Sequence, residues 1–354
     1  MYRRAFTLVE MLVTVVIIGM LATLSLAAFR VVQQSVKIDR TRSTIAKIDA
    51  YVMEEYEALR TRRIPVNVMS ASFSAVPVGA PATAEYAGRS LDTTRDFFRL
   101  ELPDRWSDIT SQPLVFDWTT NPTTGATQQW TDHKPAATLG MQGIYLRARN
   151  ALLTKGKTLD EANAILSHYE SAKLLYMIVM RDQDARDHFR EDEVTRPDED
   201  GLPVFVDAWG NPILFIRWAP GFDQSEIQSE VTPIDNAAAR LAASVDVSNR
   251  DDLNTEGVYR TGGMLAPVTT ESGLPTATVI PISIGWKLLP LIYSAGPDGV
   301  YDIWAGTSAD QFAGNPYAVF TGFTPARSFG SAVDFDADGM GHYDNITNHQ
   351  GTAR

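Results

Sequence analysis

An apolar run near the N-terminus, from Ala5 to Phe29, constrains this chain more than any other feature. It contains one ionisable residue, Glu10, while Arg3 and Arg4 precede it and Arg30 follows it. A helix of this length reaches across the roughly 30 Å hydrocarbon core of a bilayer, because each helical residue adds about 1.5 Å. Basic residues mark the cytoplasmic side of membrane helices, so the leading arginines predict that the C-terminal bulk of the chain crosses the membrane.

Glu10 is the anomaly in this run. A carboxylate inside an apolar membrane helix costs about 2.5–3.5 kcal/mol on insertion scales, so it needs a partner or a role. The simplest reading is an ordinary anchor whose Glu10 lies near the headgroups and stays hydrated. A second reading is a secretory signal peptide, because Ser25 to Ala27 has the small-x-small pattern of a signal peptidase site, and cleavage there would release a soluble protein. Against it, the preceding apolar run is longer than a usual signal core and contains Glu10.

The residues from Arg3 to Leu12 read Arg-Arg-Ala-Phe-Thr-Leu-Val-Glu-Met-Leu. This run resembles the cleavage and methylation signal of type IV prepilins and of the pseudopilins of type II secretion. The resemblance implies that a prepilin peptidase cuts between Ala5 and Phe6 and methylates the new N-terminus at Phe6. The family usually has glycine before the cut; Ala5 is also small, which is compatible with processing.

The same resemblance gives Glu10 a partner. In a filament of such subunits, Glu10 of one subunit pairs with the Phe6 amine of its neighbour, so two charges that would each be costly alone offset one another. The pair also sets the axial register between subunits. The implied partners are prepilin peptidase, copies of this chain or other pilin-like subunits, and an inner-membrane assembly platform.

The rest of the chain is long enough for a large head. Roughly 300 of the 354 residues follow the apolar run, which is room for one large or two small domains. The net charge of −12 disfavours nucleic acid or anionic lipid as a partner and is compatible with cation binding. The chain has no cysteine, so an extracytoplasmic head must be held by its core, helped by any bound metal.

Beyond Phe29 the helical pattern continues as an amphipathic stretch without proline as far as Ile64. Apolar residues at three- and four-residue steps predict one buried face, made of Ile38, Ile45, Ile48, Val52, Tyr56 and Leu59. Pro65 ends the pattern, because the residue before a proline is driven out of helical geometry. The predicted organisation is a leader peptide at 1–5, a transmembrane and assembly helix at 6–29, a stalk helix at 30–64 that packs on the head, and a periplasmic head at 65–354.

Within the head, the pattern predicts a second helix and several strands. Thr158 and Glu161 match a capping box, and helical spacing continues to about Phe189, with Lys173 at the edge of the apolar face. Residues 202–217 read as two strands joined by a turn at 210–212, and residues 288–293 read as a third strand. Residues 66–200 and 223–285 match no family pattern and lengthen the head.

Two segments widen the resemblance. The run Asp207-Ala-Trp-Gly-Asn-Pro-Ile and the run Tyr293-Ser-Ala-Gly-Pro-Asp-Gly are similar to a strand turn and a loop of the major pseudopilin of type II secretion. That family has a long N-terminal helix packed on an antiparallel sheet, with a calcium site in its C-terminal loops. The resemblance therefore implies an α+β, pilin-like fold with inserted helical and loop regions.

The C-terminal tail adds a candidate calcium site. Three alternate aspartates precede Gly339, which is how a calcium-binding loop opens, because oxygen ligands at every second position can converge on one ion. The match is partial, since an EF-hand has glutamate at its twelfth position, where this chain has Asn345; a polar surface turn without metal is the alternative. Including the second loop that the resemblance implies, the candidate ligands are Asp298, Asp302, Asp334, Asp336, Asp338, Asp344 and Asn345.

No catalytic motif accompanies these features. The chain has no Ser/His/Asp motif, no glycine-rich phosphate loop and no Cys or paired-His metal signature, so we expect no enzymatic activity. The sequence favours a structural subunit of a type II secretion pseudopilus or of a type IV pilus-like filament. Before assembly it would be a single-pass inner-membrane protein with a periplasmic head. The alternative is a membrane-tethered extracytoplasmic calcium-binding protein or enzyme that uses a pilin-type export signal.

Overall fold

The computed structural model describes the parts of the chain on which the following account rests. These are residues 8–62, 97–110, 118–120, 127–129, 135–219, 221–222, 225, 268–269, 275–276, 289–306, 329–335 and 344–350. The loop region expected after Pro65 and most of the insertion at 223–285 lie outside them.

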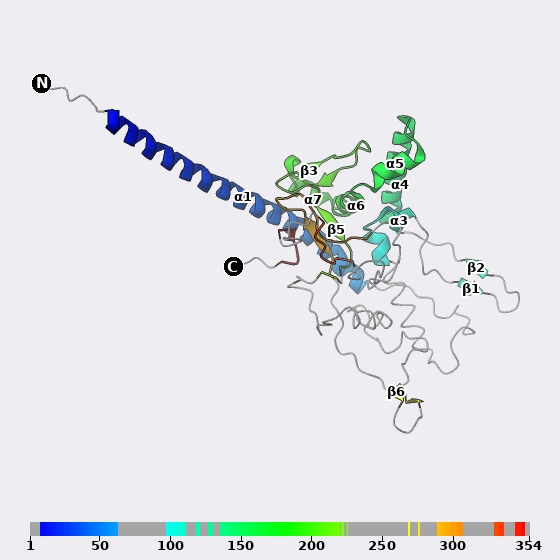
Figure 1. Ribbon diagram of the computed structural model, residues 1–354. Coiled ribbons are helices and arrows are strands. Elements are labelled where there is room, and N and C mark those ends of the chain that lie inside the picture. The colour runs from blue at the N-terminus through cyan, green and yellow to red at the C-terminus, as the bar shows by residue number, and fades with distance from the viewer. Residues whose placement is uncertain are drawn as a thin grey trace.

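Helix α1 (Leu8–Thr61) is continuous over 54 residues, which corresponds to about 80 Å. Figure 1 shows its N-terminal part projecting away from the head and its C-terminal part lying along it. Large apolar side chains are exposed throughout the projecting part, from Leu8 (82% exposed) to Val36 (60%). Further along, one face is buried in the core, and it is the face that the apolar spacing predicts: Ile45, Ile48, Val52, Tyr56 and Leu59.

The sheet beside α1 is antiparallel. Its strand order is β5 (Leu214–Ile216), β8 (Leu291–Ser294) and β9 (Ile346–Thr347), with β8 in the centre. Leu214 pairs with Tyr293 on one side of β8, and Tyr293 pairs with Thr347 on the other. Because α1 contacts both β8 and β9, the long helix and this sheet share one core. The predicted fold class, a long N-terminal helix with antiparallel sheet and inserted helices, is confirmed.

Short elements complete the head. The inserted helices are α3 (Trp106–Thr110), α4 (Ala136–Thr154), α5 (Leu159–Ser167), α6 (Glu170–Val179), α7 (Gln183–His188) and the 3-10 turn η3 (Glu191–Glu193). The further antiparallel pairs are β1 (Trp118–Thr120) with β2 (Thr127–Gln129), β3 (Val194–Thr195) with β4 (Val204–Phe205), and β6 (Val268–Thr269) with β7 (Pro275–Thr276). Residues 97–101 are also helical and bury Phe98 and Leu100.

The strand pair expected across residues 202–217 forms, but only at its turn. Val206 and Pro212 make an antiparallel bridge, and the Ile213 N–H donates to the Phe205 carbonyl at 2.9 Å. The two strands then diverge to different partners, β4 to β3 and β5 to β8. The turn therefore redirects the chain from one small sheet into the other.

The prediction of one helix from about Leu159 to Phe189 is wrong. The capping box at its start is present, with Thr158 and Glu161 bonded reciprocally, but α5 stops at Ser167 and two further helices follow. Tyr169 adopts φ of 51° between α5 and α6, a left-handed conformation that breaks a right-handed helix. Periodicity survives such a break, because each shorter helix still places apolar residues toward the same core.

Lys173 is not at the edge of an apolar face but fully buried. Its ammonium donates to Asp200 Oδ2 at 2.6 Å and to the Ile165 carbonyl at 2.9 Å, and it lies 2.7 Å from Asp198 Oδ2. The break before α6 aims this side chain at the C-terminal end of α5, where unpaired carbonyls favour a cation. Two carboxylates complete its neutralisation, which a buried charge requires.

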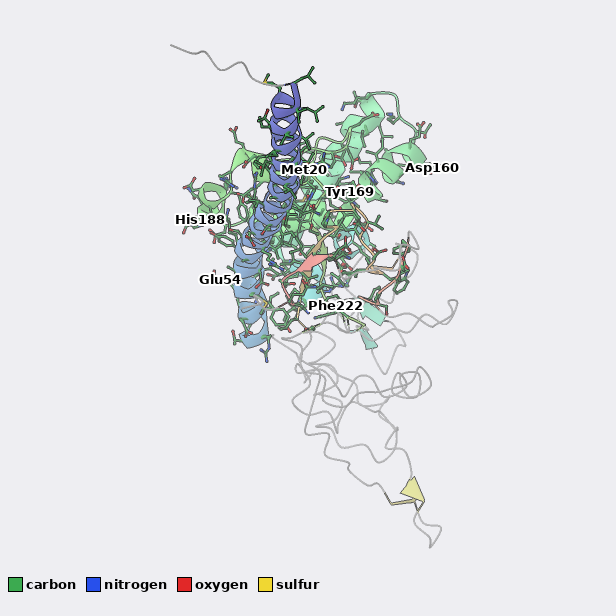
Figure 2. The ribbon with its side chains drawn as sticks, turned by 60° about the vertical axis from the view of Figure 1, so that its left-hand side comes forward. Met20, Glu54, Asp160, Tyr169, His188 and Phe222 are labelled. Atoms are coloured by element: carbon green, nitrogen blue, oxygen red, sulfur yellow. The ribbon has the colours of Figure 1, made fainter. Side chains whose placement is uncertain are left out.

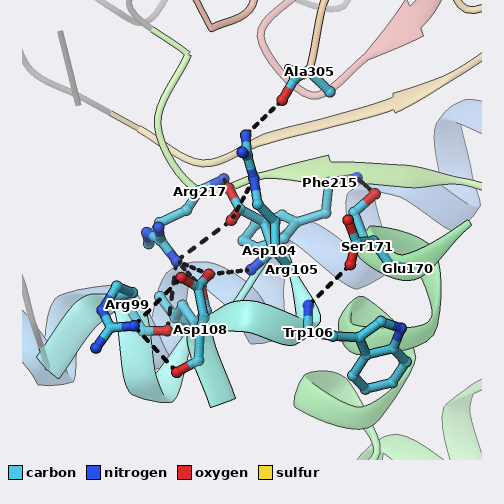
Figure 3. A network of polar contacts seen from close by, with 11 residues as sticks. Arg99, Asp104, Arg105, Trp106, Asp108, Glu170, Ser171, Phe215, Arg217 and Ala305 are labelled. Carbon is cyan, nitrogen blue, oxygen red and sulfur yellow. Dashed lines mark hydrogen bonds and ion pairs between the residues drawn. The ribbon is translucent and has the colours of Figure 1, made fainter. Parts of the chain in front are cut away.

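A second buried polar network joins residues 99–108 to β5 (Figure 3). Arg217 Nη1 donates to Asp108 Oδ2 at 2.9 Å, and the Arg217 N–H donates to Asp104 Oδ2 at 3.1 Å. At its edge, Glu170 Oε2 accepts from the Trp106 N–H at 3.0 Å. Burial, the largest effect, raises the pKa of Glu170 to about 7, against the opposing influence of the Trp106 N–H and of Arg105.

This carboxyl group makes stability depend on pH. Between an ordinary pKa of 4.5 and about 7, the folded protein holds a proton that the unfolded chain has released, so the free energy of unfolding falls as pH rises. We expect Glu170→Gln, which keeps an oxygen for the Trp106 N–H, to stabilise the protein by up to about 3 kcal/mol at pH 8. Thermal melting of the detergent-solubilised variant and wild type at pH 4.5, 6 and 8 checks this. A difference of equal size at all three pH values contradicts it.

Candidate functional site

The two segments that resemble pseudopilin motifs are joined by the side chain of Asp207. Its Oδ1 accepts from the backbone N–H groups of Trp209 at 2.8 Å and Asn211 at 2.9 Å, which closes the turn. Its Oδ2 accepts from Ser294 Oγ at 2.7 Å, and Asn211 Nδ2 donates to the Gly296 carbonyl at 3.3 Å. The turn after β4 therefore supports the loop that follows β8.

Gly296 lets the C-terminal segment approach this loop. It adopts φ of +72°, and a Cβ built on it would lie only 2.5 Å from the backbone oxygen of Asp344. Any other residue would both strain the backbone and force Asp344 away. Gly296 thus allows direct contact between the loop after β8 and the segment at Asp344, which is 48 positions further along the chain.

Three aspartates converge at this contact. One carboxylate oxygen from each of Asp298, Asp302 and Asp344 lies within 4.8 Å of the others. Asp302 is buried, Asp344 is half-buried and Asp298 is exposed, so the cluster opens to solvent on one side. Asp302 also adopts φ of 34°, a left-handed backbone that aspartate tolerates better than most residues.

The chemistry of this group fits a hard divalent cation. Desolvation and then repulsion from Asp298 raise the pKa of Asp344 to about 6, so the carboxylates strain against one another. Among the residues that the structure describes, Asp344 Oδ1 and Asn345 Oδ1 are buried and accept no hydrogen bond. Crowded, underused oxygen acceptors of this kind are suited to Ca²⁺, which prefers carboxylate and amide oxygens.

Of the other sequence-predicted ligands, the structure describes Asp334 and Asn345. Asp334 is exposed and lies outside the three-aspartate cluster, while Asp336 and Asp338 lie outside the described residues. Asn345 follows Asp344, and its Nδ2 donates to the Tyr301 carbonyl at 2.6 Å, which fixes the segment against the loop of Asp298 and Asp302. The structure therefore places Asp344 of the C-terminal tail beside Asp298 and Asp302, the two candidates from the second loop that the resemblance implies.

The cluster is linked to α1 through the end of the chain. Just after β9, Asn348 Nδ2 donates to Asp49 Oδ1 on α1 at 2.7 Å and to the Pro290 carbonyl at 2.9 Å. Its Oδ1 accepts from the Ile292 N–H at 2.9 Å. The side chain of Asn348 thus extends the pairing of β9 with β8 by one hydrogen bond, and it also bonds to α1. Nothing in the residue types near Asn348 signals this contact in the sequence, because its partner lies 299 positions away.

The N-terminal site is only partly described. Ala5 and Phe6 lie outside the described residues, and Glu10 lies within α1. The helix is long and apolar enough, by length and composition, to cross a membrane between Met11 and Thr61, and the most apolar window is entirely unburied. An exposed apolar helix of this kind requires a lipid or protein environment, because water is a poor solvent for such a surface.

Comparison with known proteins adds one finding. The family model described as the prokaryotic N-terminal methylation motif matches residues 1–26. No curated protein and no solved structure gives a significant match to the chain. The match covers the predicted leader, the predicted cleavage site and most of the exposed apolar part of α1. Together with the apolar N-terminal helix, this motif supports a type IV pilin-like protein, a prepilin-type substrate of prepilin peptidase that is anchored in a membrane by that helix.

Proposed function

We propose that this chain is a structural subunit of a type II secretion pseudopilus or of a type IV pilus-like filament. The methylation motif at 1–26, continuous with an apolar helix that projects from the head, is the observation that carries the proposal. In the membrane this helix is a single-pass anchor with the head in the periplasm. In the filament the same surface packs against the helices of neighbouring subunits, which replaces lipid contacts with protein contacts.

The secretion pseudopilus is favoured by the joined motif segments. Asp207, Asn211 and Ser294 belong to the runs that resemble the major pseudopilin, and in this chain they support one loop. We further propose that Asp298, Asp302 and Asp344 bind Ca²⁺ there. The ion would clip the C-terminal segment to the sheet in a chain that has no disulfide. We also propose that the head has no enzymatic activity.

Processing gives the first test of this function. Mass spectrometry of the mature chain, isolated from membranes, should show an N-terminus at Phe6 that carries one methyl group. The motif places the cut there, and Ala5 is small enough for the peptidase. A variant with Ala5→Gly, the residue usual in the family, serves as a positive control. An N-terminus at Ala28 or an intact Met1 would contradict the pilin-like function.

Glu10 provides the second test. Glu10→Val removes a charge that is costly in an apolar helix, so membrane insertion should be unharmed, while the Phe6 amine loses its partner during assembly. We expect normal cleavage and methylation but strongly reduced recovery of the variant in sheared filaments. Immunoblotting of the sheared-filament fraction and of the cell fraction measures this recovery. Glu10→Asp, which keeps the charge, is the matched control. Assembly of the valine variant at the wild-type level would show that Glu10 does not set the subunit register.

Calcium provides the third test. A ligand present at about 100 times its Kd stabilises a folded protein by about 2.7 kcal/mol, so the thermal midpoint of the purified protein should be higher in calcium than in chelator. The double variant Asp298→Asn/Asp344→Asn should lose this difference. In chelator it should melt above the wild type, because the repulsion between carboxylates is gone.

Asp334→Asn is the matched control for the calcium test, since it removes an exposed carboxylate from the same tail without touching the cluster. It should keep the full calcium response. Identical melting of the wild-type protein in calcium and in chelator would leave the three aspartates as an ordinary acidic surface.

A further inference from the structure

Helix α4 presents a seam of apolar and small residues to solvent. Leu139 is 53% exposed, and Leu146 and Leu153 are each 37% exposed, while the opposite face buries Met141 and Leu152. The outward positions follow one another at alternating four- and three-residue steps, which is the spacing by which one helix docks against another in a coiled coil. We call this surface the leucine face, and its members are Leu139, Gly143, Leu146, Asn150 and Leu153.

Two glycines, Gly143 in the leucine face and Gly140 next to it, are not required by packing among the described residues. Glycine is among the least favourable residues in a helix interior, yet Gly140 and Gly143 both lie inside α4. A Cβ built on Gly140 meets no atom within 4 Å among the described residues, and one on Gly143 meets only Arg147 Nη1 at an ordinary 3.8 Å. Internal packing therefore does not require glycine here, whereas close approach of another backbone would.

A positive charge, that of Arg147, borders the leucine face. Residues 135–157 contain no aspartate or glutamate but four basic residues, in a chain whose net charge is −12. Arg147 is exposed on α4, whereas Lys155 and Lys157, after the end of α4, lie against Glu199, with the Lys155 ammonium 2.9 Å from its carbonyl and the Lys157 ammonium 3.0 Å from its carboxylate. A surface of this sign on an acidic protein fits an acidic partner, because opposite potentials favour docking and exclude wrong partners.

The same chain carries a surface of the complementary sign. Ala50 and Glu54 lie on the outer face of α1, and Asp182 and Asp184 lie at the start of α7; all four are exposed. The Tyr51 hydroxyl of α1 hydrogen-bonds with His188 Nδ1 of α7, so α7 lies beside this part of α1. We call the four exposed residues the acidic face.

The two faces lie on different flanks of the head. In Figure 2, Glu54 and His188 of α7 lie on one side of α1, and Asp160 of α5, which packs on α4, lies on the other. Two different, complementary surfaces on one chain produce head-to-tail contacts, and such contacts propagate into a filament when they do not close into a ring. One flank of a head can therefore meet the other flank of the next.

We propose that the leucine face of α4 docks on the acidic face of a second copy of this chain, joining neighbouring heads side by side. The inference rests on the proposed function as a filament subunit. Leu146 packs against Ala50 of the second copy, and Arg147 meets its Glu54. The glycines let the α4 backbone come close to the partner's α1. Contacts between heads then add to those made by the apolar part of α1.

Cysteine cross-linking tests this contact, because the chain has no cysteine of its own. Cells that co-express Leu146→Cys and Glu54→Cys should yield, in sheared filaments under mild oxidation, a disulfide-linked dimer on non-reducing gels. Leu146→Cys alone should yield none, and neither should Leu146→Cys with Asp334→Cys, an exposed position that belongs to neither face. Dimers of Leu146→Cys alone, or filaments without the mixed dimer, overturn the proposal.

Two further variants separate a contact from a folding defect. Gly140→Ala/Gly143→Ala should raise the thermal midpoint of the detergent-solubilised subunit yet lower its recovery in filaments. Arg147→Glu should lower recovery roughly tenfold, and Arg147→Glu/Glu54→Arg should restore it, because each exchanged charge then meets an exchanged partner. Wild-type protein that never enters filaments would overturn the proposed function itself. Wild-type filaments in which these variants assemble normally would overturn only the contact between the two faces.

Discussion

The packing of one face of α1 against the head is the interaction on which the rest of this structure depends. Ile48, Val52 and Tyr56 are completely buried there, and each buried side chain of this size contributes about 1.5–3 kcal/mol. Polar contacts add to the seam, as where Glu193 accepts from Thr44 Oγ1 and Lys47 Nζ at 2.8 Å each. Ion pairs nearer the surface contribute at most about 1 kcal/mol. The apolar face of α1 therefore supplies most of the free energy that holds the helix on the head, and the polar contacts fix where along the head the helix packs.

That seam divides a single helix into two environments. Up to Val36, α1 exposes apolar residues all round, as a membrane or assembly surface requires, while beyond Ile38 it is amphipathic. Because the helix is continuous through the change, a force or displacement at the apolar end reaches the head without a joint in between. This continuity suits the proposed function as a filament subunit.

The three-aspartate cluster lies at the other end of the same system. Gly296 brings Asp344 beside the loop after β8, β9 then pairs with β8, and Asn348 reaches Asp49 on α1. An interaction that stabilises the cluster therefore also holds the segment at 344–348, which contacts α1 through Asn348. Asp207 also supports the loop after β8, because its carboxylate accepts a hydrogen bond from Ser294. This contact gives a physical reason why the two runs that resemble pseudopilin segments occur together in one chain.

Local pattern alone determines much of this protein. The apolar run, Glu10 and the flanking arginines identify the N-terminal signal, and three- and four-residue spacing identifies the buried face of α1, because both are properties of one helix. The capping box at Thr158 and the strand turn at Asp207 are likewise local. Tertiary structure decided the rest. The burial of Lys173 between Asp198 and Asp200 and the meeting of Asp344 with Asp298 depend on groups far apart in the chain, and the left-handed backbone of Tyr169 interrupts a helical pattern that is otherwise continuous. Periodicity is blind to such contacts, since a residue's spacing reports which face it occupies but not what lies opposite.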